Sequence, residues 1–145
     1  DCLLSRGLGD VYKRQLDGWQ DLDHWLQGWA QLDGARRGAI LHACGMLARR
    51  LHAAGQVHGC FYPKHIFLKE QGEGFAAQLI DLEKTRPLLL GERDRIKDLE
   101  PLLRRASVWS EAEVRQLLVA YLGEAGDIER WSQRLGARRR HKESR

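Results

Sequence analysis

The chain has 145 residues, which is enough for one domain with one moderate hydrophobic core. Hydrophobic residues make up 43% and charged residues 30%, an ordinary balance for a globular protein, and no apolar run approaches the roughly 18 residues of a membrane-spanning helix. The formal net charge of +4 would suit nucleic acid or an anionic membrane surface, but much of the excess lies in a C-terminal tail, for which a solvated terminus is the simpler interpretation. We expect no nucleic-acid partner, because the sequence shows neither a helix-turn-helix nor an aromatic-rich RNA-binding strand.

The first residues look foreign to the rest of the chain. They read DCLLSRGLGDVYKRQ, lack an initiator methionine and resemble translated adaptor sequence at the ends of metagenomic gene fragments. We therefore predict a non-native flank at 1–15, with a genuine N-terminal loop as the alternative. The domain itself is predicted at 16–136, followed by a basic tail at 137–145.

Helical spacing dominates the first third of the domain. A helix is predicted at about 22–29, where four apolar side chains recur at helical spacing and Asp21 or Asp23 is the candidate N-cap. A longer helix is predicted at about 33–54, because one apolar stripe recurs at i, i+4, i+7 and i+11. This stripe consists of Ile40, Cys44, Leu47 and Leu51. We interpret Cys44 as a small buried hydrophobic residue.

A polar loop and a β-hairpin follow the long helix. The loop spans 57–65, and the first strand begins with the β-branched and aromatic run at 66–68. A turn cluster at 71–74 leads into the returning strand at 75–80, which predicts a hairpin loop of about four to six residues. Asp81 stands at the end of the second strand.

The chain becomes helical again after Pro87. The first of these helices carries an apolar stripe of Ile96, Leu99, Leu102 and Leu103. Ser110 and Glu113 form a capping box that opens the next helix, which Gly123 ends. A last short helix is predicted at about 127–135. The chain is therefore expected to be α+β and mostly helical.

The order of helix, polar loop, hairpin and acid is informative about chemistry. Phosphoryl transfer needs a group near the acceptor hydroxyl and metal ligands near the nucleotide phosphates. Protein kinases place a histidine, an acid and a metal-binding asparagine in one loop, and a second metal-binding acid after the hairpin that follows. Here the loop at 58–65 reads HGCFYPKH, and the acid lies in LIDLE at 79–83.

The stretch LHAAGQVHGCFYPKHIFL…LIDLEKTR resembles the lipopolysaccharide kinase (Kdo/WaaP) family, especially its InaA-like branch. The resemblance covers about 16–135 and continues in RDRIKDLE at 93–100 and RQLLVAYLG at 115–123. It implies the C-terminal lobe of a protein-kinase-like fold, made of helices and a catalytic-loop β-hairpin. It also implies ATP-dependent phosphorylation of a sugar hydroxyl of the lipopolysaccharide inner core, with ATP and Mg²⁺ as cofactors.

The resemblance assigns three residues to the catalytic loop. His58 would brace the loop backbone, although an ordinary buried histidine is the alternative. Cys60 occupies the position of the catalytic aspartate. Lys64 could contact phosphate or acceptor, or simply be solvated.

Three further residues would hold the nucleotide and support the loop. Asp81 would be the principal Mg²⁺ ligand, or else a plain strand-end acid. His65 stands where kinases use a metal-binding asparagine, or it could cap the first strand of the hairpin. Asp98 would lie on the helix under the loop and accept hydrogen bonds from its backbone amides, or else form only a helix-surface pair.

Cys60 is the main departure from the family pattern. A carboxylate at this position orients the acceptor hydroxyl and takes its proton, whereas a cysteine side chain is a weak hydrogen-bond acceptor. The protein could be a degraded kinase, Glu83 could replace the missing acid, or the chain could be a pseudokinase or stress-related interaction module without transfer activity.

A second departure is that no glycine-rich G-x-G-x-x-G loop is present for the nucleotide phosphates. We therefore expect an incomplete domain whose N-terminal lobe is missing and which cannot hold ATP tightly alone. The alternative enzyme class is a kinase that acts on protein or on a small molecule such as an aminoglycoside. The resemblance implies a cytoplasmic protein at the inner face of the bacterial inner membrane, with the basic tail as a contact.

Overall fold

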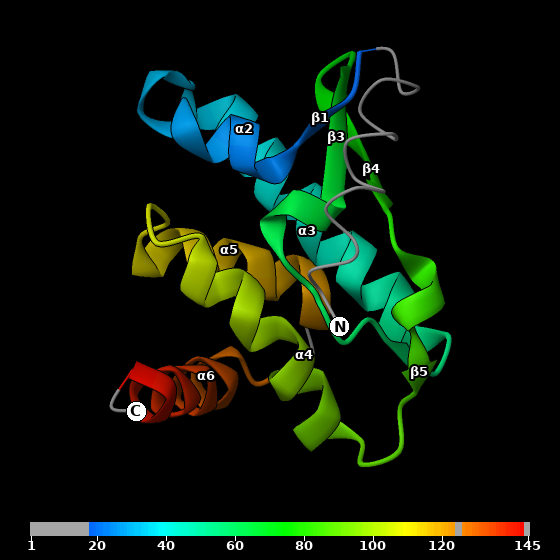
Figure 1. Ribbon diagram of the computed structural model, residues 1–145. Helices are drawn as coiled ribbons and strands as arrows, with labels where there is room; N and C mark the ends of the chain where they lie inside the picture. Colours follow the sequence, from blue (N-terminus) through cyan, green and yellow to red (C-terminus); the bar gives the residue numbers. More distant parts are fainter. Residues whose placement is uncertain (1–17, 124–125, 144–145) are drawn as a thin grey trace.

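The computed structural model describes residues 18–123 and 126–143, so the predicted flank at 1–15 lies outside the described residues. Helices make up most of the fold, and a small antiparallel sheet lies at one end (Figure 1). The helices are α2 (Leu22–Gln27), α3 (Gly34–Ala53), α4 (Glu92–Arg105), α5 (Glu111–Leu122) and α6 (Ile128–Glu143). The strands are β1 (Gln20–Asp21), β2 (Gln56–Val57), β3 (Ile66–Gln71), β4 (Gly74–Leu79) and β5 (Arg86–Pro87).

The predicted helix ends follow from local chemistry. The Asp21 side chain accepts a hydrogen bond from the third residue of α2, and the Asp33 side chain caps α3 in the same way. Ser110 and Glu113 form the predicted capping box at the start of α5. Gly55 follows the end of α3 with a φ of 80°, a conformation that side chains with a Cβ disfavour.

The hairpin differs from the expectation in its loop. β3 and β4 pair in register as far as Gln71 and Gly74, so only two residues form the turn. Gly72 adopts a φ of 59°, which a tight hairpin turn requires, and the predicted loop of four to six residues is therefore wrong. The sequence also missed the pairing of β1 with β3 and of β2 with β5, because two-residue strands carry no readable alternation.

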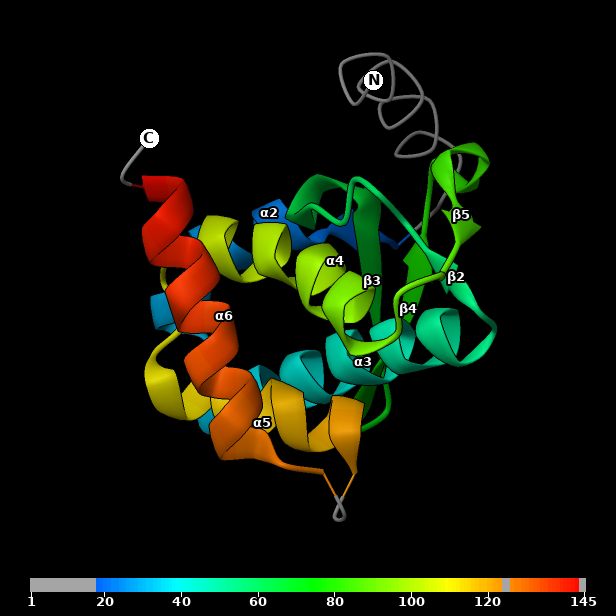
Figure 2. The ribbon, with the colours of Figure 1, turned by 90° about the horizontal axis from the view of Figure 1, so that it is seen from below.

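Helix α3 is the centre of the core. It packs against β4 on one side and against α5 on the other, while α6 packs against both α4 and α5 (Figures 1 and 2). Fully buried side chains from α2, α3, β3, α4 and α5 meet here, among them Leu22, Ile40, Leu41, Leu68, Leu99, Leu102, Leu117 and Leu118. Cys44 is fully buried among them, and burial raises the pKa of its thiol to about 12, which confirms its interpretation as an apolar core residue.

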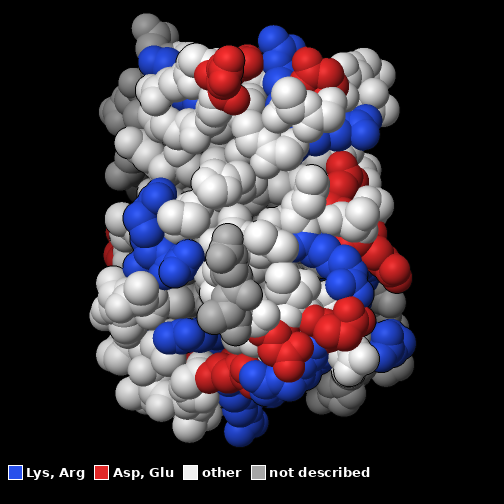
Figure 3. Space-filling model, turned by 180° about the vertical axis from the view of Figure 1, so that it is seen from behind, with Lys and Arg blue, Asp and Glu red and all other residues white. Residues whose placement is uncertain are grey.

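The last helix is longer than predicted. α6 continues through three consecutive arginines, 138–140, to Glu143 instead of ending near residue 135. Alanine and arginine are good helix formers, and Glu92 of α4 pairs with Arg130 and Arg134 on the exposed side of α6. Figure 3 shows acidic and basic side chains lying side by side over the lower part of the face that it presents.

Within the described ranges, no helix is long and apolar enough to cross a membrane.

The close approach of α3 and α5 depends on Gly45. A Cβ at this position would lie 2.6 Å from the Leu117 carbonyl oxygen and 2.8 Å from the Ala120 Cβ. We predict that Gly45→Ala lowers the free energy of unfolding by about 1–3 kcal/mol, because the two helix backbones must separate. Urea unfolding would measure the change.

Gly38→Ala is the matched control on the same helix, because a Cβ there meets nothing within 4 Å. We expect it to be neutral or to stabilise by up to about 1 kcal/mol, through the higher helix propensity of alanine. Equal effects of the two substitutions would contradict the packing argument.

Candidate functional site

The loop at 58–65 and the acid after the hairpin lie together in the structure. The Ile80 amide donates to the His65 carbonyl at 3.0 Å, and the Ile80 carbonyl accepts from the His58 ring at 2.9 Å. Ile80, the residue that precedes Asp81, therefore holds both ends of the loop. Within the loop, the amides of Tyr62 and His65 donate to the carbonyls of Cys60 and Tyr62, which makes a compact turn.

A buried carboxylate on α4 anchors the start of this loop. Asp98 accepts from the backbone amides of His58 and Gly59, each at 2.9 Å, so the hydrogen bonds expected from the sequence are present. It also accepts from Nε2 of His52 at 2.8 Å. Burial opposes ionisation of this carboxyl, yet these hydrogen bonds hold its pKa below the ordinary value.

The anchor continues into the core. The Tyr121 hydroxyl lies 2.6 Å from Nδ1 of His52, and burial raises the pKa of Tyr121. The phenol therefore stays protonated and can donate to His52, whose other nitrogen donates to Asp98. The result is a buried chain of hydrogen bonds from α5 through α3 and α4 to the loop backbone.

The two loop histidines are fixed as opposite tautomers by backbone groups. Nε2 of His58 must donate to the Ile80 carbonyl, so Nδ1 is left to accept from the Cys60 amide at 3.2 Å. Nδ1 of His65 must instead donate to the Cys60 carbonyl at 2.6 Å. Burial lowers the pKa of His65, which favours the neutral ring with its lone pair on Nε2.

Asp81 has the geometry of a ligand residue. It is 5% exposed, and neither carboxylate oxygen has a hydrogen-bond partner in the described part of the chain. Its φ of 64° and ψ of 42° are left-handed, the only such conformation at a non-glycine residue among those described. A strained, buried carboxylate without a donor is costly unless something outside these residues binds it.

These residues fit a hard divalent cation held jointly with another ligand. No group of three or more His, Cys, Asp or Glu side chains in the described residues is arranged to hold a metal. Mg²⁺ usually takes one or two carboxylates and completes its octahedron with water and phosphate oxygens, so Asp81 fits this role. The His65 imidazole is a softer donor than Mg²⁺ prefers and is the weaker fit.

The other two predicted residues lie on the same loop. Cys60 is 7% exposed and is held through its backbone by both loop histidines. Nζ of Lys64 lies 5.6 Å from the centre of the Tyr62 ring, which in turn stacks on His65. The Arg105 guanidinium lies closer, 3.9 Å from the same ring centre.

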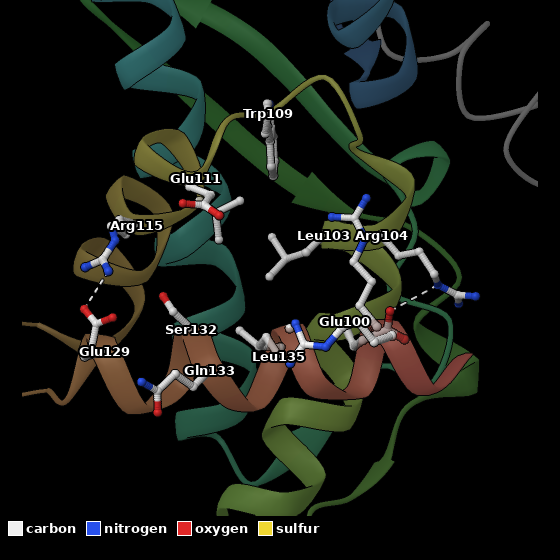
Figure 4. A pocket seen from close by; sticks show the side chains of 14 residues that line it. Glu100, Leu103, Arg104, Trp109, Glu111, Arg115, Glu129, Ser132, Gln133 and Leu135 are labelled. Carbon is white, nitrogen blue, oxygen red and sulfur yellow. Dashed lines mark hydrogen bonds and ion pairs between the residues drawn. The ribbon is translucent and has the colours of Figure 1, made fainter. Parts of the chain in front are cut away.

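Two cavities lie near α4. One, of about 490 Å³, opens beside Gly59 and Tyr62 of the loop. The other, also about 490 Å³, lies among α4, α5 and α6, with Trp109 on one side and Ser132 on the other (Figure 4). Glu100 lines both cavities, but none of the residues that the sequence assigned to transfer lines the second.

His52, Tyr121 and Arg105 were not predicted from the sequence. A signal was present for the first two, since His52 lies one helical turn before the loop and Tyr121 lies in the segment RQLLVAYLG. Nothing in the local pattern distinguished Arg105 from other exposed arginines. Its position over Tyr62 depends on how α4 packs against the loop.

The arrangement of helices, hairpin and loop is similar to that of a known structure, WaaP in complex with acyl carrier protein. The TM-score is 0.73 at 23% identity, over 88% of this chain and 57% of that chain. At this identity the likeness shows the fold, which is α+β and kinase-like.

The model of the lipopolysaccharide kinase (Kdo/WaaP) family matches residues 9–121, and the chain belongs to this family. Protein InaA of Escherichia coli (strain K12) is 29% identical over 85 residues, which are 59% of this chain and 39% of that protein. The chain therefore spans less than two thirds of either relative. These matches confirm the family resemblance drawn from the motifs.

The Asp98 anchor generates a stability prediction. We expect Asp98→Asn to lower the free energy of unfolding by about 3 kcal/mol at neutral pH, because it removes a buried charge to which three donors are directed. Because the folded pKa is depressed, this stabilisation is present above the pKa of the unfolded carboxyl and is lost as the pH falls through the folded pKa. Urea unfolding across acidic pH would show a smaller pH dependence in the variant.

Asp94→Asn makes the same change on the same helix and serves as the control. Its carboxylate accepts only from the exposed amides of Leu89 and Leu90, so we expect a smaller loss. A variant at Asp98 as stable as the one at Asp94 would refute the anchoring role.

Proposed function

We propose that residues 16–136 form the C-terminal lobe of a kinase that transfers phosphate from ATP to a sugar hydroxyl of the lipopolysaccharide inner core. The observation that carries this proposal is Asp81, a buried carboxylate in left-handed geometry with two oxygens lacking a donor, next to a loop braced from α4. Family membership supports the reaction class. The sugar acceptor rests on the name of the family.

In this proposal Asp81 and His65 hold Mg²⁺ together with the nucleotide phosphates. When bound, the ion would neutralise charge on the phosphates during transfer. His58 and Asp98 keep the loop backbone in place, so that position 60 faces the acceptor hydroxyl. Lys64, on the same loop, is the candidate contact to phosphate or acceptor.

The identity of residue 60 separates two functions. If the chain is an active kinase, another carboxylate must orient the acceptor, and Glu83 is the candidate, being exposed in the turn directly after Asp81. If no carboxylate does so, the protein is a pseudokinase or interaction module of the same fold. The hydrogen bonds that brace the loop are compatible with both.

The proposal includes a partner lobe. The glycine-rich loop and the lysine that nucleotide binding needs would belong to an N-terminal lobe missing from this chain, and the partial coverage of WaaP and InaA supports an incomplete domain. Cytoplasmic location, and contact of the basic end of the chain with the inner face of the inner membrane, are further parts of the proposal. They rest on where such acceptor lipids reside.

Nucleotide binding is tested on the protein completed with its upstream segment. We predict that Mg·ATP raises its unfolding temperature and that Asp81→Asn abolishes this shift, since a bound ligand stabilises the folded state. Asparagine is chosen because it tolerates the left-handed backbone at this position. Glu73→Gln in the hairpin turn is the matched control and should keep the full shift; an unchanged shift in Asp81→Asn would exclude Asp81 as the ligand.

Transfer is tested at position 60 of the same completed protein. We expect Cys60→Asp to raise the rate of phosphate transfer by about 10²-fold or more if the site is a degraded kinase, because a general base typically contributes this factor. Release of labelled phosphate to lipopolysaccharide core would measure the rate. No gain, with nucleotide binding intact, would favour the interaction module instead.

A further inference from the structure

The cavity beside the loop has a composition that the transfer chemistry does not explain. Gly59 and Tyr62 of the loop form one wall, and the residues of α4 from Asp94 to Arg104 form another. Val57 of β2, four residues of the following segment (Arg86, Pro87, Leu89 and Leu90) and Arg138 of α6 complete it. Neither Asp81 nor His65 lines this cavity, so it is separate from the proposed metal ligands.

Two of the three carboxylates of this cavity accept hydrogen bonds from the chain itself. Asp94 accepts from the Leu90 and Leu89 amides at 2.8 and 2.9 Å, and these bonds hold its pKa below the ordinary range. Asp98 receives the three loop and histidine donors already described. Glu100 is 1% exposed and lies 3.1 Å from Nε of Arg104, an ion pair that is poorly aligned for a hydrogen bond.

Three of the four cationic side chains of the cavity have no such partner among the described residues, since only Arg104 is paired, with Glu100. The four, Arg86, Lys97, Arg104 and Arg138, face three carboxylates. Arg86, Lys97 and Arg138 make no hydrogen bond or close ion pair with any described residue, although Lys97 and Arg86 act at longer range on Asp94. Nε of Arg138 is in addition buried without a hydrogen-bond partner. Apart from Glu100, whose charge is paired with Arg104, the cavity therefore offers donors rather than acceptors, which suits an oxyanion.

The rim of the cavity is apolar. Leu89 is 80% exposed and Leu90 is 59% exposed, and both line the cavity beside the cations. Neighbouring exposed leucines next to a charged pocket favour a ligand that has a carbon skeleton as well as a charge. An inorganic anion would leave this surface in water.

We propose that the cavity binds a phosphate monoester, with the phosphate on Arg86, Lys97 and Arg138 and the organic part over Leu89 and Leu90. A phosphate monoester carries nearly two negative charges at pH 7, which matches several donors at once. Because Gly59 and Tyr62 form a wall of the cavity, such a ligand lies next to position 60. Its role as the acceptor of transfer rests on the proposed function, whereas its binding does not.

The test is calorimetric titration of the 145-residue chain with phenyl phosphate and with inorganic phosphate, in EDTA and at low ionic strength. We expect phenyl phosphate to bind more tightly, and Lys97→Gln or Arg138→Gln to weaken it about 10-fold each, as expected for loss of one charge-assisted hydrogen bond. Arg93→Gln, which removes a charge from an exposed position on the same helix outside the cavity, should leave the affinity unchanged.

Each other outcome counts against the proposal. Equal affinity for the two probes would overturn the organic part and leave a simple anion site. No binding of either probe, or the same loss in Arg93→Gln as in Lys97→Gln, would overturn the site altogether. Since the titration contains neither Mg²⁺ nor nucleotide, its failure is distinguishable from failure of the kinase proposal, and the exposed position of Lys97 keeps that variant foldable.

Discussion

The geometry of the candidate site depends on one buried carboxylate. Asp98 lies on α4, yet its hydrogen bonds reach the loop backbone at His58 and Gly59 and the His52 ring on α3. A buried charge is stable only when donors compensate its lost hydration, and here all three donors come from elements that must be packed correctly. The loop can therefore take this conformation only when α3, α4 and the hairpin are assembled.

The second constraint is that backbone groups determine the tautomers of the two loop histidines. His58 and His65 are neighbours on one loop, but one donates from Nε2 and the other from Nδ1, because each faces a carbonyl that can only accept. Ile80 is held by the His65 carbonyl and the His58 ring, so the left-handed Asp81 that follows it is positioned without a hydrogen bond to its own side chain. Neither carboxylate oxygen of Asp81 accepts a hydrogen bond from the described part of the chain, and this is the observation on which the kinase proposal rests.

Position 60 shows how little of this scaffold depends on the residue that kinases use for catalysis. Cys60 contributes its amide and its carbonyl to the loop, and both interactions would be the same with aspartate there. The fold can therefore persist after the acid is lost. The phosphate-binding cavity that we propose is lined by Gly59 and Tyr62 together with residues of α4 and α6, and Cys60 is not among its lining residues.

Local patterns in the sequence determined much of this protein. The caps at Asp21 and Ser110, the buried stripe around Cys44 and the order of loop, hairpin and acid follow from short-range spacing, and the family followed from motifs of the same kind. The short strand pairings did not follow, since they join segments far apart in the chain, and the two-residue hairpin turn and the full length of α6 were not predicted either. The tautomers of the loop histidines, the chain from Tyr121 through His52 to Asp98 and the cations gathered beside Tyr62 were decided only by the tertiary structure. Hydrogen bonding and charge depend on which groups meet in space, and these groups are separated by 40 or more residues along the chain in the cases of Asp98 with His58 and with His52.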